Sequence, residues 1–111
     1  MVRLPAHAAL PPWAAGSGFW SISRSADELS IVGPAAAVPA GVPSHGPLAA
    51  FRVRGTLDFA LVGIIARLTA PLAERGIPVF VVSTYLTDYL LVPADRSADA
   101  EEAWRTAGVE V

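Results

Sequence analysis

The stretch VSTYLTDYLLV, residues 82–92, places polar groups between two apolar runs. The polar groups include the hydroxyls of Ser83 and Thr84, the ring of Tyr85 and the carboxylate of Asp88. Asp is common in hairpin loops because its side chain hydrogen-bonds the nearby backbone, and for this residue alone a turn is the preferred interpretation. A carboxylate in a bend can also pair with the ammonium group of a ligand.

A second stretch, GTLDFALVG from Gly55 to Gly63, joins a predicted strand to a predicted helix. The first N–H groups of a helix lack helical partners, so such a start attracts a carboxylate or phosphate. Capping of the helix by Thr56 or Asp58 is the simpler interpretation. Gly63 would fall in the second turn, where glycine costs ~1 kcal/mol relative to alanine. Close approach of a ligand or of another backbone would explain that glycine.

The two stretches form an amino-acid clamp if they lie at the same end of a sheet or meet across an interface. Asp88 would hold the ammonium group, and the amides of residues 59–62 would hold the carboxylate. Thr84 and Tyr85 would form the pocket. The candidate ligand-binding residues are Asp58, Phe59, Ala60, Leu61, Val62, Gly63, Ile64, Thr84, Tyr85 and Asp88.

Candidates for catalysis and for metal binding are scarce. The chain has no cysteine, which excludes thiol catalysis, disulfides and cysteine zinc sites. The two histidines, His7 and His45, lie in proline- and glycine-rich segments without a nucleophile or a spaced acid beside them. We therefore expect no catalytic residue, no metal site and no cofactor, and a protein that is not an enzyme.

Composition narrows the classes of partner. Net charge is -2 and the eight basic residues are scattered arginines, which disfavours nucleic-acid binding. The apolar run 59–66 is far shorter than the ~20 residues of a membrane-spanning helix, and early prolines interrupt any signal-type core. Because 53% of the residues are hydrophobic, we expect apolar surface that a partner covers, with a homodimer as the simplest arrangement. The lack of cysteine fits a cytoplasmic protein.

Three regions follow one another along the chain. Residues 1–18, rich in Ala, Pro and Gly, are expected to form a flexible tail. Residues 19–48 are expected to form a β-hairpin, with strands over 19–23 and 28–32, and a Pro/Ala/Gly-rich connector. Residues 49–111 are expected to form one α+β domain.

Strands and helices alternate within the third region. Strands are expected over 50–54, 77–84, 89–92 and 109–111, with one helix between the first two strands and a second beginning at Ser97. This βαββαβ order predicts a ferredoxin-like two-layer sandwich, with both helices on one face of an antiparallel sheet. Pro71 should kink or split the first helix, and Gly76 suits its left-handed closing position. The valine-rich strand over 77–84 should be buried on both faces.

A faint repeat relates the two hairpins. When they are aligned, Asp27 matches Asp88, Ser23 matches Thr84, and Leu29 matches Leu90, so each hairpin carries a hydroxyl four residues before an acid. Either this match is accidental, or the N-terminal hairpin is the remnant of a shortened first copy of the same unit.

The stretch FRVRGTLDFALVGIIARLTAPLAERGIPVFVVSTYLTDYLLV, residues 51–92, resembles the ACT-domain family. It is most similar to short bacterial ACT proteins related to the cytosolic arginine sensors, and FWSISRSADELSIV resembles the degenerate first ACT unit of that branch. The phrase from Ala70-Pro71-Leu72 to Asp88 and Val92 is fairly specific for the branch.

The resemblance implies a non-enzymatic regulatory domain that binds an amino acid at an interface between units. Ligand contacts would come from residues 58–64 and from Thr84, Tyr85 and Asp88, and the domain would regulate a protein partner. The arginine sensors have an acidic residue where this chain has Leu61, which leaves the identity of the amino acid open. The alternative is a protein-interaction or dimerisation module with the ACT fold and no ligand.

Overall fold

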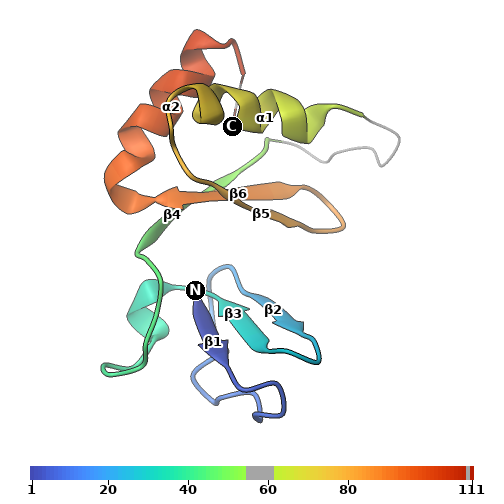
Figure 1. The fold of residues 1–111 in the computed structure, drawn as a ribbon, viewed down its shortest axis with the longest axis vertical. Helices are drawn as coiled ribbons and strands as arrows, with labels where there is room; N and C mark the ends of the chain where they lie inside the picture. Colours follow the sequence, from blue (N-terminus) through green and yellow to red (C-terminus); the bar gives the residue numbers. More distant parts are fainter. Residues whose placement is uncertain (55–61, 110) are drawn as a thin grey trace. The chain divides into compact units, whose positions relative to one another are not determined.

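A computed structural model describes residues 1–54, 62–109 and 111 of the chain. These residues fold into two compact units, Met1–Pro47 and Leu48–Val111 (Figure 1). We call them the N-terminal unit and the C-terminal unit and describe each by itself. The helices in the described part of the chain all lack the length and apolarity that crossing a bilayer requires.

The N-terminal unit is built on a three-stranded antiparallel sheet with the order β1-β3-β2. Its elements are β1 (Val2–Leu4), β2 (Ser21–Arg24), β3 (Leu29–Val32) and the short 3-10 helix η1 (Ala35–Ala37). Leu29 and Ile31 alternate on one face of β3, and they form a buried cluster with Val2 and Ala14. The expectation of a flexible tail over residues 1–18 is therefore wrong, because β1 pairs with β3 and Val2 lies in the core.

The β2–β3 hairpin agrees with the predicted one to within two residues. The Ser25 amide donates to the Glu28 carbonyl at 2.9 Å, which closes the polar turn. Arg24 reaches back from β2 and donates to the Ala8 carbonyl at 2.9 Å. This side chain anchors the segment after β1, which composition alone suggested would be mobile.

The C-terminal unit has the element order β4, α1, β5, β6, η2, α2. The bounds are β4 (Leu48–Arg52), α1 (Ile64–Glu74), β5 (Phe80–Ser83), β6 (Asp88–Pro93), η2 (Ala94–Arg96) and α2 (Ser97–Thr106). The strands form an antiparallel sheet with the order β4-β6-β5. Figure 1 shows both helices over the same side of this sheet, as the sequence predicts.

The core of the C-terminal unit lies between the sheet and the helices. Leu90 and Val92 alternate on one face of β6 and are fully buried against Leu68 and Leu72 of α1 and Trp104 of α2. Burying one leucine side chain contributes roughly 2 kcal/mol. The period of two along β6 therefore determines which strand residues face the helices.

The ends of α1 depend on two glycines in the left-handed region. Gly76 has φ +66, and the Ile77 amide donates to the Leu72 carbonyl at 2.9 Å, which confirms the predicted closing position. Gly63 has φ +77 and is the N-cap of α1 rather than a residue of its second turn. A Cβ at Gly63 would meet nothing within 4 Å, so backbone conformation explains this glycine and close approach does not. Pro71 lies inside α1 without splitting it.

Two strand predictions need correction. The strand expected to be buried on both faces is the sheet edge β5, where Phe80 and Val81 are each 38% exposed. The third strand along the chain, β6, is central instead, because both β4 and β5 pair with it. The described residues of the last predicted strand, Val109 and Val111, are not in a strand. The Val109 amide instead donates to the Trp104 carbonyl at 2.9 Å and closes α2.

Candidate functional site

Asp88 lies at the first position of β6, at the end of the sheet where β4 leads toward α1. The Val53 amide donates to the Asp88 carbonyl at 3.0 Å, so Asp88 is opposite the residue that follows β4. Because Leu90 and Val92 face the helices, the alternation along β6 places the Asp88 side chain on the same face. Only 9% of the residue is exposed. The acid thus lies beneath the helical layer rather than on the outside of a turn.

A hydrogen bond within the hairpin holds the carboxylate of Asp88. The Ser83 hydroxyl donates to Asp88 Oδ1 at 2.7 Å, across the paired strands β5 and β6. Among the described residues, Oδ2 has no hydrogen-bond partner. Ser83 therefore fixes the orientation of the carboxylate and leaves one oxygen for a donor from elsewhere.

The bend between β5 and β6 is stabilised by its own threonines. The Thr84 hydroxyl donates to the Thr87 carbonyl at 3.0 Å and accepts from the Thr87 amide at 3.3 Å. The Thr87 hydroxyl donates to the Val53 carbonyl at 3.1 Å, and Thr87 is buried. The Thr84 side chain is therefore occupied by hydrogen bonds within the turn. The Thr87 side chain connects the turn to the residue that follows β4.

Replacing Thr87→Val is expected to destabilise the protein by about 1–3 kcal/mol, because the buried Val53 carbonyl loses its donor. Urea unfolding followed by circular dichroism measures the change. Thr69→Val is the matched control, since the Thr69 hydroxyl donates to the Ile65 carbonyl within α1, where that carbonyl keeps its helical bond. Equal midpoints for the two variants would contradict the structural role of Thr87.

The predicted helix-start residues are only partly described. Asp58, Phe59, Ala60 and Leu61 lie outside the described residues. Val62 is 90% exposed, Gly63 is the N-cap of α1, and Ile64 is its first residue and packs against the core. The N–H groups of the first turn of α1 lack helical partners, as the clamp requires.

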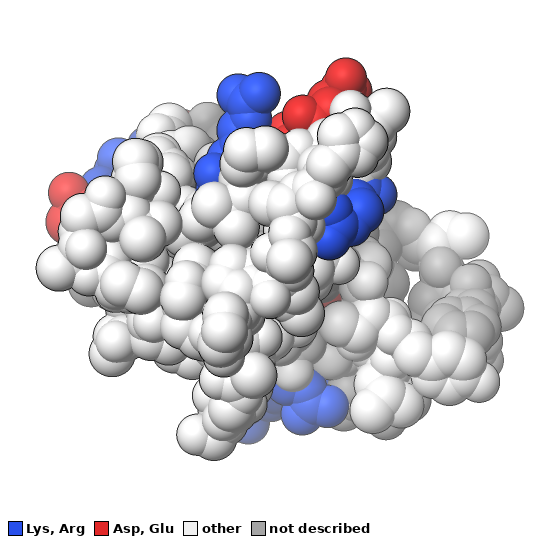
Figure 2. All heavy atoms as spheres, turned by 90° about the horizontal axis from the view of Figure 1, so that it is seen from below, with Lys and Arg blue, Asp and Glu red and all other residues white. Residues whose placement is uncertain are grey.

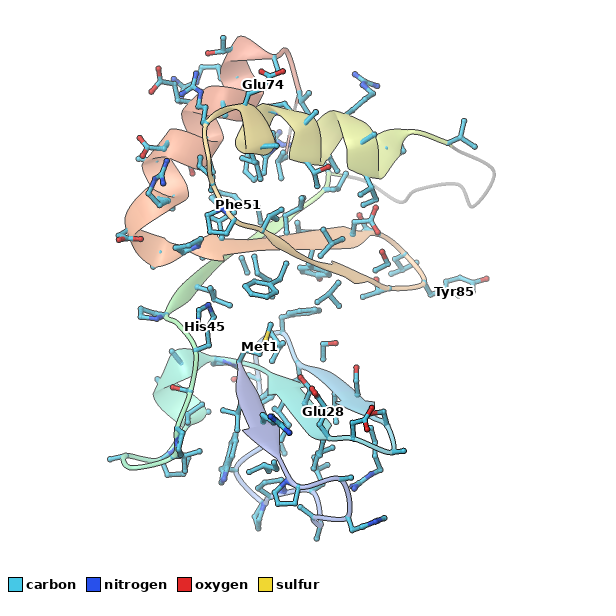
Figure 3. The ribbon with its side chains drawn as sticks, in the orientation of Figure 1. Met1, Glu28, His45, Phe51, Glu74 and Tyr85 are labelled. Carbon is cyan, nitrogen blue, oxygen red and sulfur yellow. The ribbon has the colours of Figure 1, made fainter. Side chains whose placement is uncertain are left out.

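Tyr85 occupies a different environment from Asp88. It is 78% exposed, and Figure 3 shows its side chain at the tip of the β5–β6 hairpin, pointing away from the sheet. Within one C-terminal unit, Tyr85 therefore does not close over the Asp88 carboxylate. A ligand that extends past the hairpin tip, or a second protein surface, could reach this side chain.

A hollow of about 150 Å³ opens beside the start of α1. Its lining includes Val53, Ile64, Arg67, Leu68 and Val109. Arg67 is not among the candidate residues that the sequence suggests. Its spacing of three residues from Ile64 puts both on one side of α1, and that is the signal that could have found it.

The N-terminal unit has a more open hollow of about 520 Å³. Its lining includes Met1, Arg3, Glu28, Ser30 and His45, and Figure 3 labels three of these residues. Met1 and His45 exchange hydrogen bonds through their main chains at 3.0 and 2.9 Å. Partial burial lowers the pKa of the Met1 ammonium group.

The described residues contain no group of three or more His, Asp or Glu side chains that could hold a metal ion. Most atoms on the face drawn in Figure 2 belong to uncharged residues. The sequence of the C-terminal unit contains no histidine or lysine that could activate Ser83 as a nucleophile. The arrangement is suited to holding a small polar ligand.

Comparison with known proteins is consistent with this geometry. The profile of the ACT domain family matches residues 44–105, and a profile of an N-terminal domain matches residues 1–41. The crystal structure of a protein from Agobacterium tumefaciens is 38% identical in sequence, with a TM-score of 0.90 over 97% of this chain and 81% of that one. The chain has no match among the curated proteins.

ACT domains are generally regulatory modules that bind small ligands. The antiparallel sheet with two helices on one face has the ferredoxin-like ACT architecture, so the predicted fold class is confirmed. The family profile covers more than half of the chain, and the related crystal structure covers nearly all of it. The chain therefore belongs to the ACT domain family.

Proposed function

We propose that this chain is a cytoplasmic regulatory domain that binds an amino acid at the end of the sheet where β4, α1 and the β5–β6 bend converge. Asp88 receives the ammonium group of the ligand, and the first turn of α1 receives its carboxylate. Binding then changes how the domain associates with a second copy or with a regulated protein. A ligand does so only to the extent that it prefers one of these states.

One observation carries the proposal, namely the burial and orientation of Asp88. A turn-forming Asp is usually exposed, whereas this residue is 9% exposed and faces the helical layer. A buried carboxylate costs free energy unless it is paired or hydrogen-bonded. Ser83 bonds only Oδ1, so an ammonium group at Oδ2 would complete the set of partners.

The other end of the ligand has two kinds of donor available. From the sequence, the amides of residues 59–62 are assigned to its carboxylate, together with Gly63 and Ile64 at the described start of α1. Arg67 lines the hollow beside this helix start and adds a positive charge there. Thr84 stabilises the bend, and the side chain of Tyr85 points away from the sheet at its tip (Figure 3).

A homodimer would complete the site. Apolar side chains remain exposed in the C-terminal unit: Val62, Ile65, Phe80, Val81, Tyr85 and Leu86. Several of them lie on the edge strand β5 or at the adjoining bend. Covering them with a second copy would remove this apolar surface from water and place another molecule near the bend.

A screen of the twenty amino acids by calorimetry and thermal shift tests the proposal. At a ligand concentration about 100-fold above Kd, the folded chain gains about 2.7 kcal/mol of stability. One amino acid, or a small group with similar side chains, should therefore raise the melting temperature and release or absorb heat. A screen with neither heat nor a thermal shift would favour the alternative, an interaction module with the ACT fold and no ligand.

A further inference from the structure

We propose that the C-terminal unit carries a second, separate site that binds a small organic carboxylate with an apolar body. The site is a hollow of about 300 Å³ between β4 and the last turns of α2. This volume is at the lower end of the range for small-molecule sites, so it suits a compact ligand. Its lining includes neither Asp88 nor any of the residues assigned to the amino acid, and it shares only Val109 with the hollow beside the start of α1.

The floor of this carboxylate site is a rigid aromatic pair. The rings of Phe51 and Trp104 pack edge to face, with centroids 5.0 Å apart and an interplanar angle of 74°. Trp104 Nε1 donates to the Leu68 carbonyl at 2.8 Å, and this buried bond fixes the indole ring. Trp104 is only 2% exposed, so the half-buried ring of Phe51, held in place by Trp104, provides most of the apolar surface of the floor.

The wall of the site comes from the segment after α2. Gly108 turns the chain with φ +71, and the Val109 amide donates to the Trp104 carbonyl. This turn brings Val109 and Val111 to the lining. An apolar ligand body would therefore contact the Phe51 ring below and valine side chains at the side.

Two guanidinium groups converge at the rim from different elements. Arg54 follows β4, and Arg105 lies in the last turn of α2. The helix dipole favours a cation at the position of Arg105, but it does not explain why Arg54 reaches the same hollow. Within residues 1–54, 62–109 and 111, neither guanidinium has a salt bridge or hydrogen bond.

The other arginines on and beside α2 are neutralised. Arg75 pairs with Glu102 at 3.6 Å, and Arg96 pairs with Asp99 at 3.0 Å. The contrast shows that acids are available along α2 but do not pair with Arg105. Among the described acids, none pairs with Arg105 or with Arg54.

The charged side chains that line the hollow indicate which class of anion would bind. Glu101 lies on the same face of α2 as Arg105, one turn earlier, and it also lines the hollow. Among the described side chains of the lining, two arginines and one glutamate give a net positive charge, which suits a carboxylate monoanion better than a doubly charged phosphate. Guanidinium groups bind carboxylates through paired hydrogen bonds. An apolar body on the aromatic floor completes the recognition.

Phenylacetate is the probe, and its neutral isostere phenylacetamide is the matched ligand. The full chain, labelled with ¹⁵N, is titrated with each while the indole N–H signal of Trp104 is followed, assigned by its loss in Trp104→Phe. Phenylacetate should give a saturable shift in the millimolar range or below, and phenylacetamide should bind at least roughly tenfold more weakly. No saturable shift with phenylacetate, or equal affinity for both, would overturn the proposal.

Three variants locate the site. Arg54→Gln and Arg105→Gln should each weaken phenylacetate binding roughly tenfold or more, the effect of losing one charge-assisted hydrogen bond. Arg52→Gln makes the same charge change in β4 outside the lining and should leave the affinity unchanged. If all three variants lose affinity equally, the anion responds to overall charge and the site does not exist. Asp88→Asn should retain phenylacetate binding, which separates this site from the amino-acid site.

Discussion

Asp88→Asn is expected to weaken binding of the amino acid by about 3 kcal/mol, or roughly a hundredfold. Asparagine keeps the shape of the side chain and an oxygen for the Ser83 hydroxyl, so the bend should fold normally. It cannot offer a negative charge to an ammonium group beneath the helical layer. Calorimetry with the ligand found in the screen measures the loss, and gel filtration should show an unchanged oligomeric state.

Asp27→Asn is the matched control for Asp88→Asn. Asp27 is in the corresponding hairpin of the N-terminal unit, where it is exposed and its amide donates to the Ser25 hydroxyl at 3.2 Å. The same chemical change there should leave the affinity within error. If Asp88→Asn binds the amino acid as well as the unmodified chain does, then Asp88 is a structural residue of the bend.

Trp104→Ala is expected to lower the free energy of unfolding by about 3–5 kcal/mol. The ring is 2% exposed and belongs to the core between the sheet and both helices. Its removal leaves a cavity beside Phe51 and deprives the buried Leu68 carbonyl of its indole donor. A loss of this size is a large fraction of the roughly 5–15 kcal/mol that stabilises a typical protein.

Urea unfolding followed by fluorescence or circular dichroism tests the role of Trp104. Leu86→Ala, which truncates an apolar side chain that is 50% exposed, should change stability by no more than about 0.5 kcal/mol. Trp104→Phe should fall between the two, because it keeps most of the apolar volume and loses the bond to α1. Similar midpoints for Trp104→Ala and Leu86→Ala would show that α2 is not anchored through this ring.

The sequence predicts the architecture of the C-terminal unit well because its signals are periodic. Leu68 and Leu72 recur on one face of α1, and Leu90 and Val92 alternate in β6. The spacing of apolar residues within each element therefore predicts which of its faces is buried. Gly76 closes α1 because only glycine readily adopts its positive φ. Apolar periodicity and helix-closing glycines depend only on residues close together in sequence, and both predictions agree with the structure.

The sequence is less informative about short elements and about the order of strands in a sheet. β1 has only three residues, too few for a pattern, so a strand was mistaken for a tail. The position of β5 at the sheet edge depends on pairing with β6, which valine content does not encode. Gly63 was placed inside α1 because the start of the helix was predicted too early, and its left-handed conformation at the N-cap explains it instead.

The candidate sites differ in how far the sequence reveals them. Asp88 could be singled out as an acid in a hairpin, but its burial under the helices follows from its register with Val53 in the folded sheet. Arg67 lines a hollow in the folded unit, and its charge alone does not predict this position. Arg54 and Arg105 belong to segments far apart in sequence, and only the packing of α2 beside β4 brings them to one hollow.

A crystal structure of the chain grown with a mixture of the twenty amino acids would test the central proposal most directly. We expect electron density for one amino acid, with its ammonium nitrogen within roughly 3 Å of Asp88 Oδ2 and its carboxylate toward the start of α1. Density for an amino acid bound elsewhere, with the Asp88 carboxylate bonded only to Ser83, would contradict it.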